Sequence, residues 1–119
     1  MNQDKDPKYN LEERTGKFGE DIIRFCLKIN KNTVTNPLIN QLVKCGTSVG
    51  ANYCEADDAE SKLDFRHKIG ICKKEARESQ HFLKMIIVAQ PENSEEAMIL
   101  LQEAIELNLI FNSIYKKVS

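Results

Sequence analysis

Five basic residues recur at regular intervals along the middle of the chain and are its strongest candidates for binding chemistry. They are Lys62, Arg66, Lys73, Arg77 and Lys84, separated by 4, 7, 4 and 7 residues. In an α-helix, at about 100° per residue, they fall within roughly 60° of one another around the axis. Such a row can contact successive phosphates of RNA or another polyanion and would bind in a salt-sensitive way. The alternative is a solvated face whose charges pair with Glu75, Glu78 or acidic residues of a neighbouring subunit.

Four further polar residues form a second candidate set. Asn52 and Glu55 interrupt a segment that is otherwise almost uncharged, and Arg14 and Lys68 are the partners expected for them. Polar residues in such a position can line a functional groove, or they can fix the register of packed helices. Asn108 allows the same two interpretations near the end of the chain.

The other reactive residue types form no recognisable catalytic or metal-binding pattern. His67 and His81 lie 14 residues apart, or about 21 Å along a helix, so they cannot share a metal ion within one chain. The acidic segment 57–60 lacks the alternating ligands and central glycine of a calcium loop. The four cysteines include no Cys-x-x-Cys pair and are expected to be reduced thiols. We therefore expect no enzymatic activity, no cofactor, no metal ion and no small-molecule substrate.

Composition limits the class of protein further. A length of 119 residues with 41% hydrophobic residues suits one domain with a real core. Charged residues make up 29%, and the net charge of −1 gives no overall bias toward nucleic acid or membrane. No apolar run approaches the roughly 20 residues of a membrane span, and the first residues lack the apolar core of a signal peptide. We expect a cytoplasmic protein without a membrane partner.

Apolar residues spaced three and four apart predict four helices, at about 11–29, 37–56, 62–89 and 95–118. The expected N-caps are Asn10 (with Glu13), Asn36 (before Pro37), Ser61 (with Asp64), and Asn93 or Ser94. The buried seams are Leu11, Thr15, Phe18, Ile22, Phe25 and Ile29; Leu38, Leu42, Cys45, Val49 and Ala56; Phe65, Ile69, Cys72, Ala76, Ser79, Leu83 and Ile86; and Ala97, Leu101, Ala104, Asn108, Phe111, Tyr115 and Val118. Short links between such helices predict an all-α, antiparallel, up-down-up-down four-helix bundle over residues 10–119, after a flexible tail at 1–9.

The second predicted helix organises the others. Beyond its seam it carries few charges and many small residues, and its candidates for an oligomer interface are Gly46, Ser48, Gly50, Ala51 and Tyr53. Gly46 and Gly50 are four residues apart, so they share a face that a second backbone can approach closely. We expect this helix to be buried on two sides, one facing its own bundle and one facing another chain.

Several segments of these helices resemble a known family. They are Gln41-Leu42, residues 47–53, Glu55-Ala56, Asp64-Phe65, Lys68-Ile69, Ile71, Lys74-Glu75-Ala76, and Arg14-Thr15 with Phe18. Together they are similar to the four-helix-bundle proteins named after the 23S rRNA intervening sequence, over about residues 11–88. The resemblance implies an antiparallel bundle assembled as a homopentameric ring, without enzymatic activity or cofactor. Some members are encoded inside intervening sequences of bacterial 23S rRNA genes. A related group, the accessory variability determinant of diversity-generating retroelements, is a basic pentamer that works with RNA and a reverse transcriptase.

The chain departs from the family pattern at two places. Lys44-Cys45 stands where the resemblance leads us to expect Arg-Ser, and Phe82 stands where Trp is frequent. Lysine keeps the charge but loses the two-point geometry with which arginine holds a phosphate. The net charge of −1 also differs from that of the basic retroelement group. RNA binding through the basic residues and a protein–protein scaffold therefore remain the two alternatives.

Overall fold

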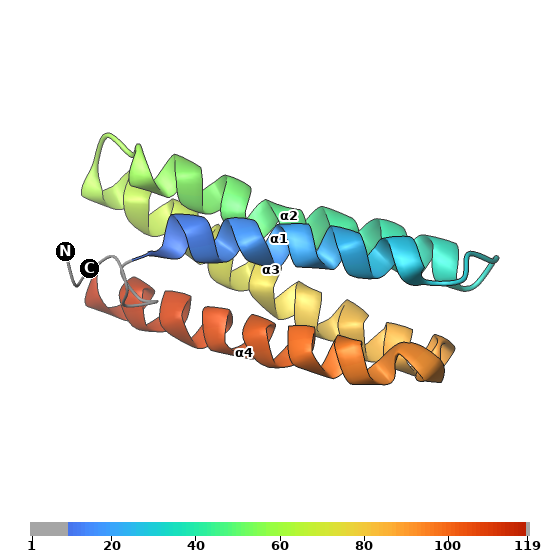
Figure 1. Ribbon diagram of the computed structural model, residues 1–119. Coiled ribbons are helices and arrows are strands. Elements are labelled where there is room, and N and C mark those ends of the chain that lie inside the picture. Colours follow the sequence, from blue (N-terminus) through green and yellow to red (C-terminus); the bar gives the residue numbers. More distant parts are fainter. Residues whose placement is uncertain (1–9, 119) are drawn as a thin grey trace.

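The computed structural model describes residues 10–118, which form four α-helices and no strand (Figure 1). The helices are α1 (Leu11–Lys28), α2 (Thr35–Asp57), α3 (Lys62–Ala89) and α4 (Ser94–Lys117), with a short 3-10 turn, η2 (Pro91–Asn93), before α4. The prediction of an all-α fold with four helices is confirmed. The predicted tail at residues 1–9 lies outside the described residues.

Consecutive helices run in opposite directions. Ile22 of α1 lies against Gly46 of α2, whereas Thr15, earlier in α1, lies against Gly50, later in α2. The contacts between α2 and α3, and between α3 and α4, show the same reversal. In Figure 1 the α1–α2 loop and the α3–α4 turn accordingly lie at one end of the bundle, and the α2–α3 loop lies at the other.

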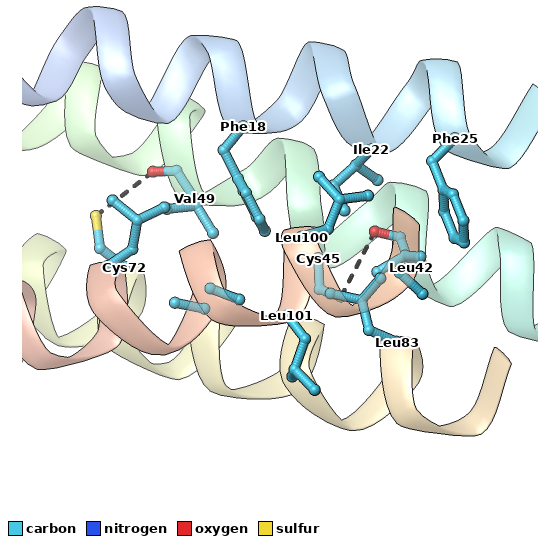
Figure 2. Close-up of a cluster of buried hydrophobic side chains, with 14 of the residues drawn as sticks. Phe18, Ile22, Phe25, Leu42, Cys45, Val49, Cys72, Leu83, Leu100 and Leu101 are labelled. Carbon is cyan, nitrogen blue, oxygen red and sulfur yellow. Dashed lines mark hydrogen bonds between the residues drawn. The ribbon is translucent and has the colours of Figure 1, made fainter. Parts of the chain in front are cut away.

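The core lies between the four helices and follows the predicted seams. All seam residues are buried except Leu38, Phe65, Asn108, Tyr115 and Val118, which are half-buried. Figure 2 shows Phe18, Ile22 and Phe25 pointing from α1 into the cluster that they share with α2, α3 and α4. Full burial of each such side chain contributes about 1.5–3 kcal/mol, so this core accounts for most of the driving force for folding.

The start of α3 confirms its predicted cap, because the Ser61 hydroxyl accepts the Asp64 N–H at 3.0 Å. The start of α2 does not confirm the prediction of Asn36 as N-cap. Asn32 Oδ1 accepts the Thr35 N–H at 2.9 Å, and Thr35 Oγ1 accepts the Asn32 N–H at 3.0 Å. This reciprocal pair satisfies two backbone donors at once, so Asn32 caps the helix and Asn36 lies inside it.

The segment Pro91–Lys117 is long and apolar enough to cross a membrane by length and composition alone. This corrects the expectation that no stretch would approach that limit. The reason is that only Glu103 and Glu106 carry charge between Glu96 and Lys116. α4 nevertheless packs its buried residues against the rest of the bundle, as the core helix of a globular protein does.

Candidate nucleic-acid interface

The basic stripe, which we define as Lys62, Arg66, Lys73, Arg77 and Lys84, lies along one side of α3. Lys62, Arg77 and Lys84 are exposed, and Arg66 and Lys73 are half-buried. Because α3 is one continuous helix, the rise of about 1.5 Å per residue spreads the five residues over about 33 Å. The sequence predicted this shared side, and the uninterrupted helix makes the row rigid.

Tyr115 of α4 packs against the stripe. The Arg66 guanidinium lies 3.7 Å from the centre of the Tyr115 ring, and Lys73 Nζ lies 4.5 Å from it. Arg66 Nε also donates a hydrogen bond to the Tyr115 carbonyl at 3.3 Å. Gly70 leaves space for the ring, since a Cβ there would meet Tyr115 Cε1 at 3.1 Å. Sequence reasoning placed Tyr115 only on a core seam, because spacing within α4 does not reveal which residues of α3 lie opposite.

The stripe has no carboxylate partner within residues 10–118, where no salt bridge includes any of its members. Three of the four carboxylates of α4 pair with α1 instead. Glu103 and Glu106 pair with Arg14 at 2.7 and 3.0 Å, and Glu96 pairs with Lys28 at 3.1 Å. Hydrogen bonds from Gln102 and Arg14 hold the pKa of Glu106 below its ordinary value. The two charged surfaces of the bundle are therefore separated.

The second candidate set, Arg14, Asn52, Glu55 and Lys68, is not brought together as one groove. Lys68 Nζ lies 2.6 Å from Glu55 Oε1, so this expected pair forms, and the carboxylate raises the pKa of Lys68. Asn52 Nδ2 donates to the Ser48 carbonyl one turn earlier, at 2.8 Å. Arg14 reaches α4 instead, as described above. The four residues form three separate contacts, each of which joins or stabilises helices.

The predicted interface residues are divided between the inside and the outside of the chain. A Cβ at Gly46 would meet Ile22 at 3.0 Å, and a Cβ at Gly50 would meet Thr15 at 3.3 Å. Both glycines therefore allow close approach of the chain's own α1. For Gly46, which is buried, this corrects the expectation that it faces another chain, whereas Gly50 is half-buried and also lines a surface groove. The physical reason is that α1 presents small residues of its own, including Gly19, at the same level.

The other three interface candidates have different surroundings. Ser48 is half-buried, and its hydroxyl donates to the Lys44 carbonyl at 2.6 Å. Tyr53 is half-buried, with its ring 6.0 Å from that of Phe111. Ala51 is exposed. It borders a hollow of about 220 Å³ between α1 and α2, which we call the α1–α2 groove. The lining residues of this groove are Glu12, Thr15, Gly16, Gly19, Glu20, Ile23, Thr47, Gly50, Ala51 and Cys54.

The cysteines and acidic residues offer no second site. Cys26, Cys45 and Cys72 are buried free thiols, and Cys54 is an exposed one. Burial raises the pKa of Cys26 to about 11 and that of Cys72 to about 12, so both remain protonated at neutral pH. Within residues 10–118 no three His, Cys, Asp or Glu side chains come together in a way that could hold a metal ion.

Comparison with known proteins shows the family of the chain. The family described as "23S rRNA-intervening sequence protein" matches residues 8–113. The chain belongs to this family. The predicted resemblance is thus confirmed, and the match extends through most of α4. A similar solved structure is the crystal structure of a protein of unknown function from the S23 ribosomal protein family of Bacteroides thetaiotaomicron. Its sequence is 30% identical to that of the chain described here, and the two structures align with a TM-score of 0.78. The match covers 88% of this chain and 97% of that one. No curated protein matches the chain.

Proposed function

We propose that this protein is a non-enzymatic, homo-oligomeric helical bundle that binds RNA through the basic stripe of α3. The observation that carries the proposal is the separation of charges. Glu96, Glu103 and Glu106 of α4 pair with Lys28 and Arg14 of α1, and no salt bridge within residues 10–118 includes a member of the stripe. Exposed cations without carboxylate partners are available for phosphates, and each phosphate contact gains free energy from counterion release.

The local charge supports the same proposal. α3 carries seven Lys and Arg residues against three Asp and Glu residues, although the whole chain has a net charge of −1. The field near α3 is therefore positive even though the total is close to zero. Phosphate recognition through charge alone requires no catalytic group, which fits the absence of a metal-ligand cluster in the described residues.

We propose the α1–α2 groove as a contact between copies of the chain. Apart from Glu12 and Glu20, its lining is uncharged and mostly small, which suits close packing of another helix. Exposed apolar side chains of α1 next to it, Ile23 and Leu27, would be covered by the contact. The number of subunits, five, comes from the family resemblance, and the cytoplasmic location is proposed from the free cysteines. In a ring, the stripe would be repeated on every subunit, and several stripes on one RNA would strengthen binding.

RNA binding is tested by its salt dependence. The double variant Arg77→Gln, Lys84→Gln removes two exposed stripe charges, while Lys17→Gln, Arg24→Gln removes two exposed charges of α1 at the same spacing of seven. Each lost phosphate contact should reduce the slope of log affinity against log salt by about 0.7–0.9. For a structured RNA, the slope of log affinity against log salt should therefore be smaller in magnitude by about 1.5 in the stripe variant. The α1 variant should keep the wild-type slope.

Two results would contradict RNA binding through the basic stripe. The first is protein that is free of nucleic acid when purified at low salt and that fails to shift structured RNA in a gel at about 50 mM salt. The second is an equal loss of slope in the stripe and α1 variants. The first result would favour a protein–protein scaffold, the second candidate function. Exposed apolar residues of α4, Met98 at 54% and Leu109 at 60% exposure, are the observation that favours that candidate.

The interface is tested at Ala51, because its side chain is exposed and borders the α1–α2 groove. Ala51→Arg should lower the mass measured by light scattering toward that of one chain, since a large cation would block close packing. Ser113→Arg, an exposed position on α4, is the control and should keep the wild-type mass. An unchanged mass for Ala51→Arg would exclude the α1–α2 groove from the interface.

A further inference from the structure

Two cations of the basic stripe, Arg66 and Lys73, are restrained before any ligand binds. The Tyr115 ring lies over Gly70, and Arg66 and Lys73 stand about one turn before and after that glycine. Cation–π contacts with the ring, together with the Arg66 hydrogen bond to the Tyr115 carbonyl, restrict both side chains. Long basic side chains normally lose rotamer freedom on binding, and here part of that entropy is lost on folding.

Groups that could read bases are turned away or already occupied. The Gln80 amide donates to a carbonyl of α4 at 3.4 Å, and the Asn108 amide donates to a carbonyl of α3 at 2.7 Å. Tyr115 carries cations near its ring, and the His81 ring packs edge-on against Phe82 with centroids 5.0 Å apart. The amide and aromatic side chains along the stripe are therefore already engaged, which leaves its cations as the groups that meet a ligand.

The stripe lies outside four hollows on the surface of residues 10–118, none of which is lined by one of its members. Proteins that bind single strands usually enclose the backbone in a positively charged groove and stack its bases on aromatic rings. A straight row of cations about 33 Å long on one helix, outside those four hollows, is a different arrangement.

We infer that the stripe recognises the phosphate backbone of double-helical RNA independently of base sequence, with Tyr115 as the residue that positions Arg66 and Lys73. This inference depends on the proposed RNA binding. A duplex presents its phosphates at fixed positions, so a rigid helix on which Arg66 and Lys73 are already restrained can meet them at a lower entropic cost. The minor groove of duplex RNA is wide and shallow, and proteins recognise it largely by shape and backbone contacts. A flexible single strand must itself be ordered, and it gains no stacking in return.

The first experiment compares three RNA probes on the full chain by fluorescence anisotropy. Two are duplexes of unrelated sequence and about 20 base pairs, slightly longer than the span of a double-stranded-RNA module. The third is an unstructured oligouridylate with the same number of phosphates. The duplexes should bind with affinities within about twofold of each other, and the single strand at least about tenfold more weakly.

The outcomes separate this inference from the proposed function. If the single strand binds as tightly as the duplexes, or if the two duplexes differ by more than about tenfold, sequence-independent duplex recognition is wrong while RNA binding stands. If none of the probes binds, the proposal of RNA binding is wrong, and so is the inference that depends on it.

The second experiment tests Tyr115 as a positioning residue. Tyr115→Leu keeps an apolar side chain but removes the ring face, and it should weaken duplex binding about three- to tenfold. Single-strand affinity should change by less than about twofold, because loose contacts need no fixed cations. Tyr115→Phe keeps the ring and should bind duplex like the wild type. An equal loss for duplex and single strand would show that Tyr115 only supports the fold.

A second variant keeps Tyr115 and tests its positioning role even if Tyr115→Leu does not fold. Gly70→Ala favours the helix, and its Cβ at 3.1 Å from Tyr115 Cε1 would push the ring by a few tenths of an ångström relative to Arg66 and Lys73. It should reduce the preference for duplex over single strand in the same direction. Circular dichroism would confirm that helix content is unchanged, and an unaltered preference in this folded variant would overturn the positioning role.

Discussion

Arg14 of α1 holds the Glu103 carboxylate of α4 at two points, with nitrogen–oxygen distances of 2.7 and 2.8 Å. The side chains are only 18% and 30% exposed, so solvent screens the pair incompletely. It lies beside a hollow of about 300 Å³ between α1 and α4, which both residues line together with Phe18 and Ile99. The ion pair therefore joins two helices where apolar side chains leave space between them.

Replacement of Arg14 by lysine should destabilise the bundle although it keeps the charge. Lysine cannot form the two-point contact, so we expect the free energy of unfolding to fall by about 1 kcal/mol. Arg24→Lys is the matched control on the same helix, because Arg24 pairs only with exposed or half-exposed carboxylates of its own helix. The control should change stability by less than about 0.5 kcal/mol. Urea unfolding measures both, and equal effects would contradict the importance of two-point geometry.

Two glycine-to-alanine changes should have effects of opposite sign. At Gly16 a new Cβ has no atom within 4 Å, so the change should stabilise α1 by about 0.5–1 kcal/mol through helix propensity. At Gly46 a new Cβ would meet the fully buried Ile22 at 3.0 Å, and the strain of about 1–3 kcal/mol should exceed that gain. Urea midpoints would show the difference. Stabilisation by Gly46→Ala would mean that α1 can move away without loss.

Cysteine labelling should distinguish one thiol from the other three. Cys54 is exposed and should react with a maleimide in the native protein. Cys26 and Cys72 should react only after unfolding, because they are buried and burial raises the pKa of Cys26 to about 11 and of Cys72 to about 12. Mass spectrometry should find at most one label per native chain and none in Cys54→Ser. Rapid labelling of two or more thiols would contradict the buried positions.

Glu75 should give the stability a defined pH dependence. Burial, reinforced by Glu78, raises the pKa of Glu75, and Lys44 and Lys74 oppose the rise. A carboxyl with a raised folded-state pKa stabilises the fold below its unfolded pKa and loses that contribution as the pH rises through the folded value. Glu75→Gln should therefore raise the free energy of unfolding at pH 7, relative to wild type.

The advantage of Glu75→Gln should disappear as the pH falls below 4.5, the ordinary value for this carboxyl, because Glu75 is then protonated in both states. Glu60→Gln, at an exposed position between α2 and α3, controls for the change in total charge. Thermal unfolding across this pH range provides the measurement. An advantage that is the same at pH 7 and pH 4 would show that ionisation of Glu75 is not its cause.

The sequence determined the four helices and most of the core. Apolar residues spaced three and four apart predict which side of a helix is buried, and every predicted seam residue is buried or half-buried. The prediction that the five basic residues share one side of α3 followed from their spacing around the helix axis. The family could be recognised as well, because its signature lies in two continuous segments.

Only the tertiary structure decided which residues lie opposite one another. Spacing gives an angle around one helix axis, but it does not say which neighbour occupies that angle. Gly46 could therefore face another chain in the prediction and Ile22 of its own chain in the structure. For the same reason the sequence did not predict that Arg14 pairs with Glu103 and not with Glu55, or that Tyr115 packs against Arg66. These contacts depend on how the four helices are rotated and stacked against one another, which no single helix encodes.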